Sequence, residues 1–269
     1  MKVYYRISDN SYRKEKIPGT SKEICLKSLL RNFPSSEKII ICDNCNKDTI
    51  EMVERVANNC NIIKTNFSNA GSFDYSFDLA LENDCECINY FAEDDYVYNI
   101  NSMQELAIKE GLEKVEYVTL FDHPDKYESE YSYGETCKVF KTNNFLWRTT
   151  ISTCMTFASK TKNLKKNLAI FKRYLTNQVH PNDHCIFISL KERGNSLALP
   201  LPGLAFHTDL TYLIQKNSIH RMIDPWVFES VQFELFEKLK EKDPNLSNLE
   251  LDKRPNFKTL IMLDSFIKM

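Results

Sequence analysis

The sequence predicts an α/β protein with a mixed, mostly parallel sheet flanked by helices. The first observation is that short apolar segments alternate with helical patterns through the first half of the 269-residue chain. The second is that one of these segments, Lys38–Cys42, is apolar on both faces, as buried parallel strands are. Right-handed crossovers bring the ends of such strands to one edge, where ligands bind. The residues that follow each strand are therefore candidates for a site.

Strands and helices are expected to alternate as far as residue 121. The predicted strands are 3–7, 38–42, 62–65, 87–91 and 115–121. Ser21 can cap a helix whose apolar residues recur at every fourth position from Cys25 to Phe33. Asp48 and Glu51 have the spacing of a capping box, which predicts the start of the next helix. Further helices are predicted over 73–81 and from residue 103.

The second half of the chain has a less regular pattern. Strands are predicted over 135–141 and 153–158, and helices over 164–175 and 182–193. Gly194 is the expected stop of the helix over 182–193. A last helix is predicted from Asp224, where a capping residue is followed by a proline in the first turn.

Composition narrows the class of protein. The net charge of −2 gives no overall basic field for nucleic acid, so no nucleic-acid partner is expected. No segment approaches the roughly 18 apolar residues of a transmembrane helix, and the N-terminus does not resemble a signal peptide, so the expected location is the cytoplasm. The nine cysteines are an odd number and lie mostly in apolar runs, so we expect buried thiols in place of a disulfide framework or a zinc site.

Acidic and amide side chains follow three of the predicted strands. Residues 8–10 follow the first, Asp43 follows the second, and Glu93, Asp94 and Asp95 follow the fourth. Three adjacent carboxylates repel one another, and burying them is costly unless a cation neutralises them. Oxygen ligands suit Mg²⁺ or Mn²⁺, which can bridge protein carboxylates and a diphosphate. The alternative is a solvated loop or a set of helix caps.

Three segments in this half resemble family 2 glycosyltransferases in order and spacing. Residues 39–49 resemble the family's strand that ends in an aspartate and is followed by Asp-x-Thr, and 69–71 resemble its Asn-x-Gly segment. Residues 89–95 resemble its strand followed by the DXD motif. The resemblance covers residues 1–125 and implies a Rossmann-like GT-A fold.

The resemblance also implies one GT-A domain over residues 1–269. A nucleotide-sugar-binding half would span 1–125, an acceptor-binding half 126–220 and a helical extension 221–269. Within the first half, Asp43 would bind the base of the donor, expected to be uracil. Glu93 or Asp94 would contact the ribose, and Asp95 would bind Mn²⁺ or Mg²⁺. The other donor-binding residues that it implies are Arg6, Ser8 and Gly71.

Two residues of the second half complete the predicted site. By the same resemblance Asp183, at the start of a helix, would be the general base that takes the proton of the acceptor hydroxyl, which implies inversion. Its alternative role is a favourable contact with the helix dipole. His207 ends the extended segment 200–209 and would complete the metal shell. Its alternative role is a backbone hydrogen bond at a strand end.

The expected function is metal-dependent transfer of a sugar from a nucleotide-sugar, expected to be a UDP-sugar, to a hydroxyl group. The acceptor would be a glycan, a protein or a lipid, and the enzyme would be of the hexosyltransferase kind, acting with inversion. A retaining GT-A enzyme and a non-catalytic sugar-nucleotide- or carbohydrate-binding module are the alternatives. A nucleotidyltransferase would need a glycine-rich phosphate loop near the N-terminus, which the six glycines do not form.

Overall fold

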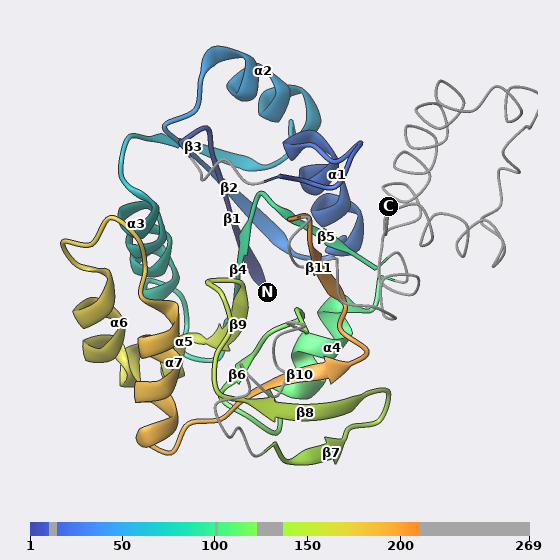
Figure 1. Ribbon diagram of the computed structural model, residues 1–269, viewed down its shortest axis with the longest axis vertical. Coiled ribbons are helices and arrows are strands. Elements are labelled where there is room, and N and C mark those ends of the chain that lie inside the picture. The colour runs from blue at the N-terminus through green and yellow to red at the C-terminus, as the bar shows by residue number, and fades with distance from the viewer. Residues whose placement is uncertain (11–14, 100–101, 123–136, 210–269) are drawn as a thin grey trace, which may run out of the picture.

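The computed structural model describes residues 1–10, 15–99, 102–122 and 137–209 (Figure 1). The strands are β1 (Lys2–Ser8), β2 (Glu37–Asp43), β3 (Asn61–Thr65), β4 (Ile88–Glu93), β5 (Tyr96–Tyr98), β6 (Tyr117–Val118), β7 (Val139–Lys141), β8 (Leu146–Thr150), β9 (Phe157–Lys160), β10 (Leu197–Leu201) and β11 (Ala205–His207). The helices are α1 (Lys22–Asn32), α2 (Lys47–Val56), α3 (Asn69–Leu81), α4 (Gln104–Gly111), α5 (Thr161–Lys166), α6 (Leu168–Leu175) and α7 (Asp183–Glu192).

A nine-stranded sheet in the order β3-β2-β1-β4-β9-β6-β10-β8-β7 runs through the molecule. The first four strands in this order are parallel, and only β9 and β8 run against the other described strands of the sheet. A second sheet pairs β11 with β5. The prediction of a mixed, mostly parallel α/β fold is therefore confirmed. The parallel register aligns Ser8 with Asp43 and Arg6 with Glu93, which brings the predicted site residues to one edge.

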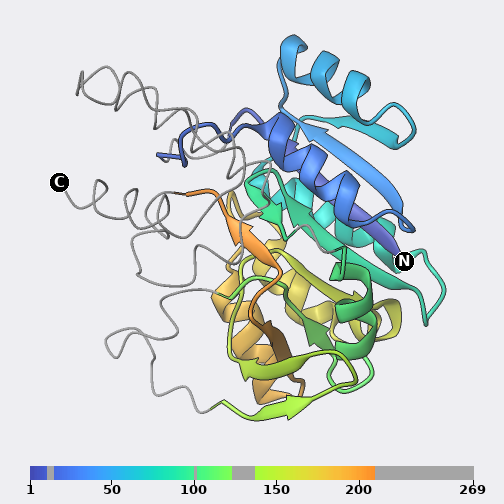
Figure 2. The same ribbon diagram turned by 90° about the vertical axis from the view of Figure 1, so that its right-hand side faces the viewer.

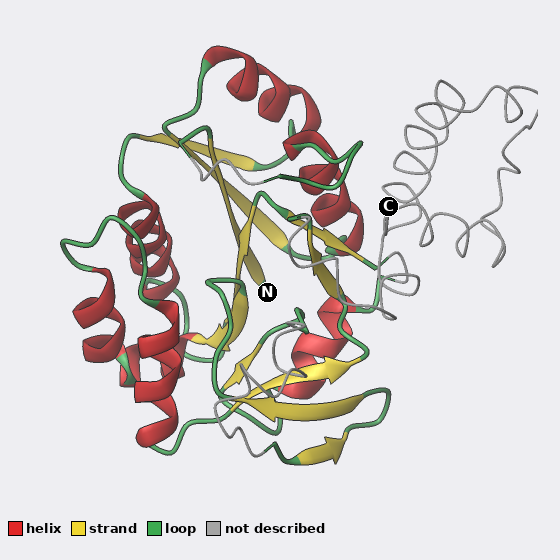
Figure 3. Cartoon of the chain, viewed as in Figure 1, coloured by secondary structure: helices red, strands yellow, loops and turns green. Residues whose placement is uncertain are grey.

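Helices cover both faces of this sheet (Figure 3). Leucine and alanine side chains of α1 and α4 pack on one face with Tyr5, Tyr90 and Trp147. Figure 2 shows these two helices on the same side of the strands. Side chains of α3, α5, α6 and α7 pack on the other face around Phe91 and Phe157. The site at the strand ends is therefore supported by apolar layers on both sides.

Helix ends in the structure mostly follow the sequence signals. The Ser21 side chain accepts a hydrogen bond from the Ile24 backbone N–H at 3.3 Å, which confirms the predicted cap of α1. Gly194, with φ +77°, follows α7 as predicted. The capping box at Asp48 is wrong. Asn46 caps α2 by accepting from the backbone N–H of Thr49 at 2.9 Å, so the helix begins earlier.

The predicted helix over 164–175 is two helices, α5 and α6, because Asn167 interrupts it. The Asn167 side-chain amide donates to the Tyr117 hydroxyl and to Asn195 Oδ1, both at 3.0 Å. This buried side chain lies at φ −108° and ψ 16°, outside helical geometry. Tertiary hydrogen bonds have therefore overridden the apolar period of the segment.

Other predicted boundaries are also shifted. The strand expected over 115–121 is limited to β6, and the strand expected over 153–158 begins only at Phe157. Of the strand expected over 135–141, the described part pairs from Val139. The strands β5, β8 and β10 were not predicted, whereas β11 lies within the expected extended segment 200–209. The helix predicted from Asp224 lies outside the described residues.

The nine cysteines, all within the described ranges, are free thiols. The expectation that they are mainly buried is wrong, because only Cys25 and Cys42 are buried, while Cys85 and Cys137 are exposed. A search of the described helices for a membrane span found none that is both long and apolar enough.

Phe157 offers a test of the layer formed by α3, α6 and α7. Its ring lies 5.2 Å from the rings of Phe91 and Phe187 and 6.0 Å from that of Phe171, and it is fully buried. We expect Phe157→Ala to lower the free energy of unfolding by about 3–5 kcal/mol, because it leaves a cavity among packed rings. Denaturant unfolding measures the change. Leu106→Ala, at a side chain 38% exposed, is the control and should change it by less than about 0.5 kcal/mol. Equal effects of the two substitutions would contradict this description of the core.

Candidate functional site

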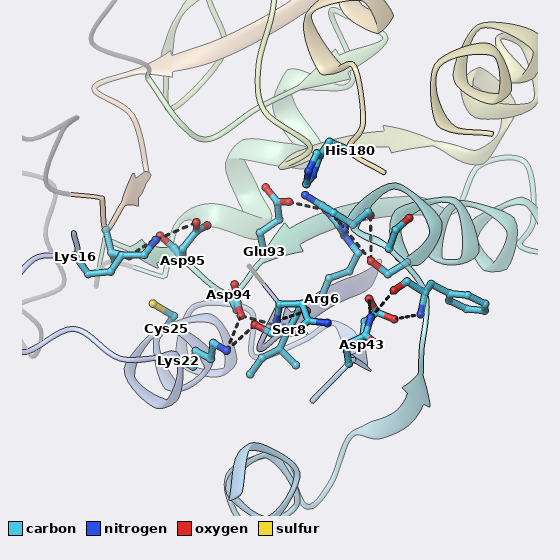
Figure 4. Close-up of a pocket in the computed structure, with 18 of the residues that line it drawn as sticks. Arg6, Ser8, Lys16, Lys22, Cys25, Asp43, Glu93, Asp94, Asp95 and His180 are labelled. Carbon is cyan, nitrogen blue, oxygen red and sulfur yellow. Dashed lines mark hydrogen bonds and ion pairs between the residues drawn. The ribbon is translucent and has the colours of Figure 1, made fainter. Parts of the chain in front are cut away.

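A pocket of about 750 Å³ lies beyond the carboxyl ends of β1, β2 and β4 (Figure 4). Among the described residues it is lined by Arg6, Ile7, Ser8, Asn10, Lys16, Thr20, Ser21, Lys22, Cys25, Asp43, Asn44, Phe67, Ser68, Asn69, Ser72, Glu93, Asp94, Asp95, Val179, His180 and Thr208. Six of the predicted site residues are among them: Arg6, Ser8, Asp43, Glu93, Asp94 and Asp95. The strand ends therefore gather the candidate residues around one cavity, as the sequence predicted.

Arg6 ties the wall of the pocket together. Its Nη2 donates to Glu93 Oε1 at 2.6 Å. Its Nη1 donates to the backbone oxygen of Asn69 at 2.9 Å, to Asn69 Oδ1 at 2.8 Å and to Ser72 Oγ at 3.1 Å. The guanidinium lies 5.1 Å from the centre of the Phe73 ring. Arg6 thus holds β1, β4 and the first turn of α3 in fixed relation.

Asp43 is buried and engaged in hydrogen bonds at the other end of the pocket. Its Oδ1 accepts from the Phe67 backbone N–H at 2.7 Å and from the Thr65 hydroxyl at 2.8 Å. Its Oδ2 accepts from the Asn44 side-chain amide at 3.0 Å. Asp43 therefore organises the loops after β2 and β3, and its role toward a base remains a prediction.

Asp94 is held close to the end of β1. The Ser8 backbone N–H donates to Asp94 Oδ2 at 3.1 Å. Lys22 Nζ lies 3.9 Å from the same oxygen, and it donates to the Ser8 carbonyl at 2.6 Å and to Asp9. Burial, with the negative charge of Asp95, raises the pKa of Asp94 to about 7.

Asp95 contacts two positively charged or proton-donating side chains. Lys16 Nζ and His207 Nε2 each lie 3.1 Å from its Oδ2. Burial acts to raise the pKa of Asp95, but His207 and Lys16 outweigh it and hold this pKa below the usual range. Its Oδ1 is buried and accepts no hydrogen bond from the described residues. Such an atom is costly to bury without a partner, by about 1–3 kcal/mol, and is suited to a cation.

The structure places His207 beside Asp95, where the sequence predicted a shared metal site. The Asp209 backbone N–H donates to His207 Nδ1 at 3.0 Å. This bond assigns the ring proton to Nε2, which donates it to Asp95. Asp95 therefore fits a metal directly through Oδ1, whereas His207 could bind one only if its proton moved to Nδ1 and its hydrogen bond from the Asp209 N–H broke. Within the described ranges, no group of three or more His, Cys, Asp or Glu side chains is arranged for a metal ion.

Asp183 begins α7 just after the loop that supplies Val179 and His180 to the pocket. Its Oδ1 accepts from the His184 backbone N–H at 2.7 Å, so it also has a local role at the helix start. Burial raises the pKa of Glu93 despite the adjacent Arg6, and the charge of Asp183 adds to this rise. Asp183 itself is not among the residues that line the pocket.

Gly71 does not line the pocket. Its backbone N–H donates to Ser68 Oγ at 3.1 Å in the first turn of α3. A Cβ at this position would lie 3.0 Å from the Phe67 side chain, so the glycine permits the close approach of that loop. Its contribution to donor binding remains a prediction and would act through the position of Phe67.

The lining residues that the sequence did not indicate include Lys16, Lys22, Phe67 and His180. Lys22 follows the cap residue Ser21 directly, so its position in the first turn of α1 could have been predicted from that cap. Lys16 reaches the site through a bridge to Asp209, a pairing between distant parts of the chain that no local pattern reveals.

Comparison with known proteins finds similarity to solved structures. No protein-family model matches the chain, and no curated protein sequence matches it. Residues 1–349 of S. aureus TarS are similar with a TM-score of 0.47 and 14% identity, over 94% of this chain and 67% of that one. The same fragment in complex with UDP is similar with a TM-score of 0.47 and 13% identity, over 94% of this chain and 68% of that one. The chain spans 43% of the longer TarS structure.

Inositol-1-phosphate CTP transferase from T. maritima is similar with a TM-score of 0.44 and 12% identity, over 86% of this chain and 96% of that one. The 4-diphosphocytidyl-2C-methyl-D-erythritol synthase from Anaerococcus prevotii is similar with a TM-score of 0.43 and 14% identity, over 87% of this chain and 96% of that one. At these values function has to be inferred from the site itself.

The raised pKa of Asp94 predicts a pH dependence of stability. Its pKa of about 7 exceeds the unfolded value of about 3.9, so the protonated form stabilises the folded chain. This contribution is complete below about pH 4 and is lost as the pH rises toward 7. We expect wild type to lose stability relative to Asp94→Asn between pH 5 and pH 8, on the order of 2 kcal/mol, measured by denaturant unfolding. The exposed Asp48→Asn variant is the control. A difference between wild type and Asp94→Asn that stays constant over this pH range would contradict the assignment.

Proposed function

We propose that this chain is a glycosyltransferase that moves a sugar from a nucleotide-sugar, a UDP-sugar in the first instance, to an acceptor hydroxyl. The observation that carries the proposal is the pocket at the strand ends, lined by Asp95, whose buried Oδ1 has no hydrogen-bond donor among the described residues. A divalent cation bound together with a nucleoside diphosphate would give this carboxylate oxygen a positively charged partner. Ligands bind at this edge in open α/β sheets, which supports the same location.

The charge of the pocket supports a cation-dependent ligand. Its described lining has three Lys and Arg side chains (Arg6, Lys16, Lys22) and four Asp and Glu side chains (Asp43, Glu93, Asp94, Asp95). A diphosphate would add at least about two further negative charges to a lining whose Lys and Arg side chains do not outnumber its Asp and Glu side chains. Mn²⁺ or Mg²⁺ held by Asp95, and by His207 after its change of tautomer, would offset this excess. When bound, such an ion stabilises the negative charge of the departing diphosphate.

The remaining residues have roles that follow from their places in the pocket. Asp43 and Asp95 lie at opposite ends of the view in Figure 4, with Glu93 and Asp94 between them. This order fits a nucleotide whose base lies toward Asp43, whose ribose lies near Glu93 or Asp94, and whose diphosphate lies near Asp95. Arg6 and Ser8 hold the wall in place through Glu93 and Asp94.

Asp183 is the proposed general base. The loop that precedes α7 is fixed to α3, because the Ala70 backbone N–H donates to the Val179 carbonyl at 3.1 Å. Asp183 follows this loop at the side of the pocket, where an acceptor hydroxyl on a glycan, a protein or a lipid would approach. Deprotonation of that hydroxyl by Asp183, opposite the leaving diphosphate, gives inversion at the anomeric carbon. The hydroxyl loses its proton to the carboxylate as its oxygen bonds to the anomeric carbon, and the bond from that carbon to the diphosphate breaks, its electron pair leaving with the diphosphate.

The proposal is tested by UDP release from UDP-sugars in the presence of Mn²⁺ and candidate acceptors. Asp183→Asn should lower kcat about 10²–10⁴-fold, with UDP affinity unchanged, because it removes only the base. Asp95→Asn should weaken UDP binding in the presence of Mn²⁺, and the exposed Asp48→Asn variant is the control for both.

Each other result has a defined meaning. Wild type that binds UDP but never releases it from any UDP-sugar would be a binding module. If NMR showed that the product retains the anomeric configuration of the donor, Asp183 would not be the general base proposed here. Release of pyrophosphate from a nucleoside triphosphate and a sugar phosphate would identify a nucleotidyltransferase. No UDP binding with Mn²⁺ would refute the proposed function.

A further inference from the structure

We propose that Lys16 binds the diphosphate of the donor directly, beside the cation that Asp95 holds. This inference rests on the proposed function, since it assigns a ligand group to one residue of the same pocket. It adds a residue that neither the sequence motifs nor the resemblance indicated.

Lys16 is the lining lysine with the most hydrogen-bonding capacity left among the described residues. An ammonium group has three N–H donors. In the described part of the chain Lys16 Nζ contacts one acceptor, Asp95 Oδ2, at 3.1 Å, and its side chain is 34% exposed. Two of its donors therefore remain for a ligand in the pocket that it lines.

The other two lining cations are already committed. Arg6 gives its two terminal nitrogens to Glu93, Asn69 and Ser72 and is 6% exposed. Lys22 donates to the Ser8 carbonyl and to Asp9, so it holds the loop after β1. Lys22 thus keeps one of its three donors, whereas Lys16 keeps two. Of the two lysines, Lys16 is therefore the better placed to bind a phosphate without giving up contacts that shape the wall.

The backbone holds Lys16 next to Asp95. The Ile17 backbone N–H donates to the Thr208 carbonyl at 2.9 Å, and the Thr208 N–H donates to the Asp95 carbonyl at 2.8 Å. Lys16 also forms a bridge with Asp209. Two hydrogen bonds thus connect the lysine segment to the end of β4, and Figure 4 shows the Lys16 side chain directed at Asp95.

Anion binding at this wall has a second source of support. Helix α1, with 11 residues, begins at Lys22, and Thr20 and the cap residue Ser21 line the same pocket as Lys16. The N-terminus of a helix carries a partial positive charge and favours phosphate groups. Lys16 and the start of α1 therefore both contribute positive charge to the lining of this pocket.

Lys16 and a divalent cation would compete for Asp95 in the free protein. Once the cation binds Asp95, repulsion turns the ammonium away from the carboxylate, and the diphosphate becomes its partner. Removing the lysine should therefore weaken binding of diphosphates. It should leave binding of Mn²⁺ alone unchanged or make it tighter.

The test is calorimetric titration of wild type and of Lys16→Met with four ligands. UDP and uridine are each titrated in the presence of Mn²⁺, pyrophosphate is titrated in the presence of Mg²⁺, and Mn²⁺ is titrated alone. Lys16→Met should weaken UDP and pyrophosphate binding about 10- to 100-fold, as expected for a lost charge-assisted hydrogen bond, with uridine unchanged. Lys16→Arg should restore binding to within a few-fold. Lys162→Met, at an exposed lysine paired with Glu86, is the matched control and should behave as wild type.

Four outcomes separate this inference from the proposed function. Equal UDP and pyrophosphate affinities in wild type and Lys16→Met would overturn the inference while leaving the function intact. Equal weakening of uridine and UDP would also overturn it, because the lysine would then act on the whole pocket. Lys16-dependent pyrophosphate binding without turnover of any UDP-sugar would uphold the inference and refute the function. A wild type that binds neither UDP nor pyrophosphate would refute both.

Discussion

The structure of the site depends on how three adjacent carboxylates at the end of β4 are neutralised. Each meets a different partner. Glu93 pairs with Arg6 at 2.6 Å, Asp94 accepts the Ser8 N–H and has a pKa raised by burial, and Asp95 contacts Lys16 and His207. Because unpaired buried charges are costly, these contacts fix the segments that carry the partners. The acidic edge is thus both the organising centre of the pocket and the reason it suits a cation.

The parallel sheet makes this arrangement possible by aligning segments that are distant in sequence. β4 lies beside β1, so Arg6 is paired with Glu93 in the register, and β2 lies beside β1, so Asp43 is paired with Ser8. The 207–209 segment then closes the site, because Thr208 bonds to the Asp95 backbone and His207 to its side chain. A site built in this way joins the first strand, the fourth strand and the last described strand.

The sequence predicted those parts of the fold and site that depend on local pattern. The strands that end at Asp43 and Glu93 are long apolar runs, so their ends and the acidic residues after them were predictable. The proximity of His207 to Asp95 followed from the family resemblance. The break at Asn167, the place of Lys16 and the tautomer of His207 depend on hydrogen bonds to Tyr117, the 208–209 segment and Asp209. No local period encodes such tertiary contacts.

The central claim is that this pocket binds a nucleoside diphosphate and a divalent cation together. Linkage requires that each ligand change the affinity of the other by the same factor. The most direct measurement is therefore the UDP dissociation constant with and without Mn²⁺, and the Mn²⁺ dissociation constant with and without UDP. The account predicts that both become tighter by the same factor, at least about tenfold. A UDP affinity that Mn²⁺ does not change would contradict it.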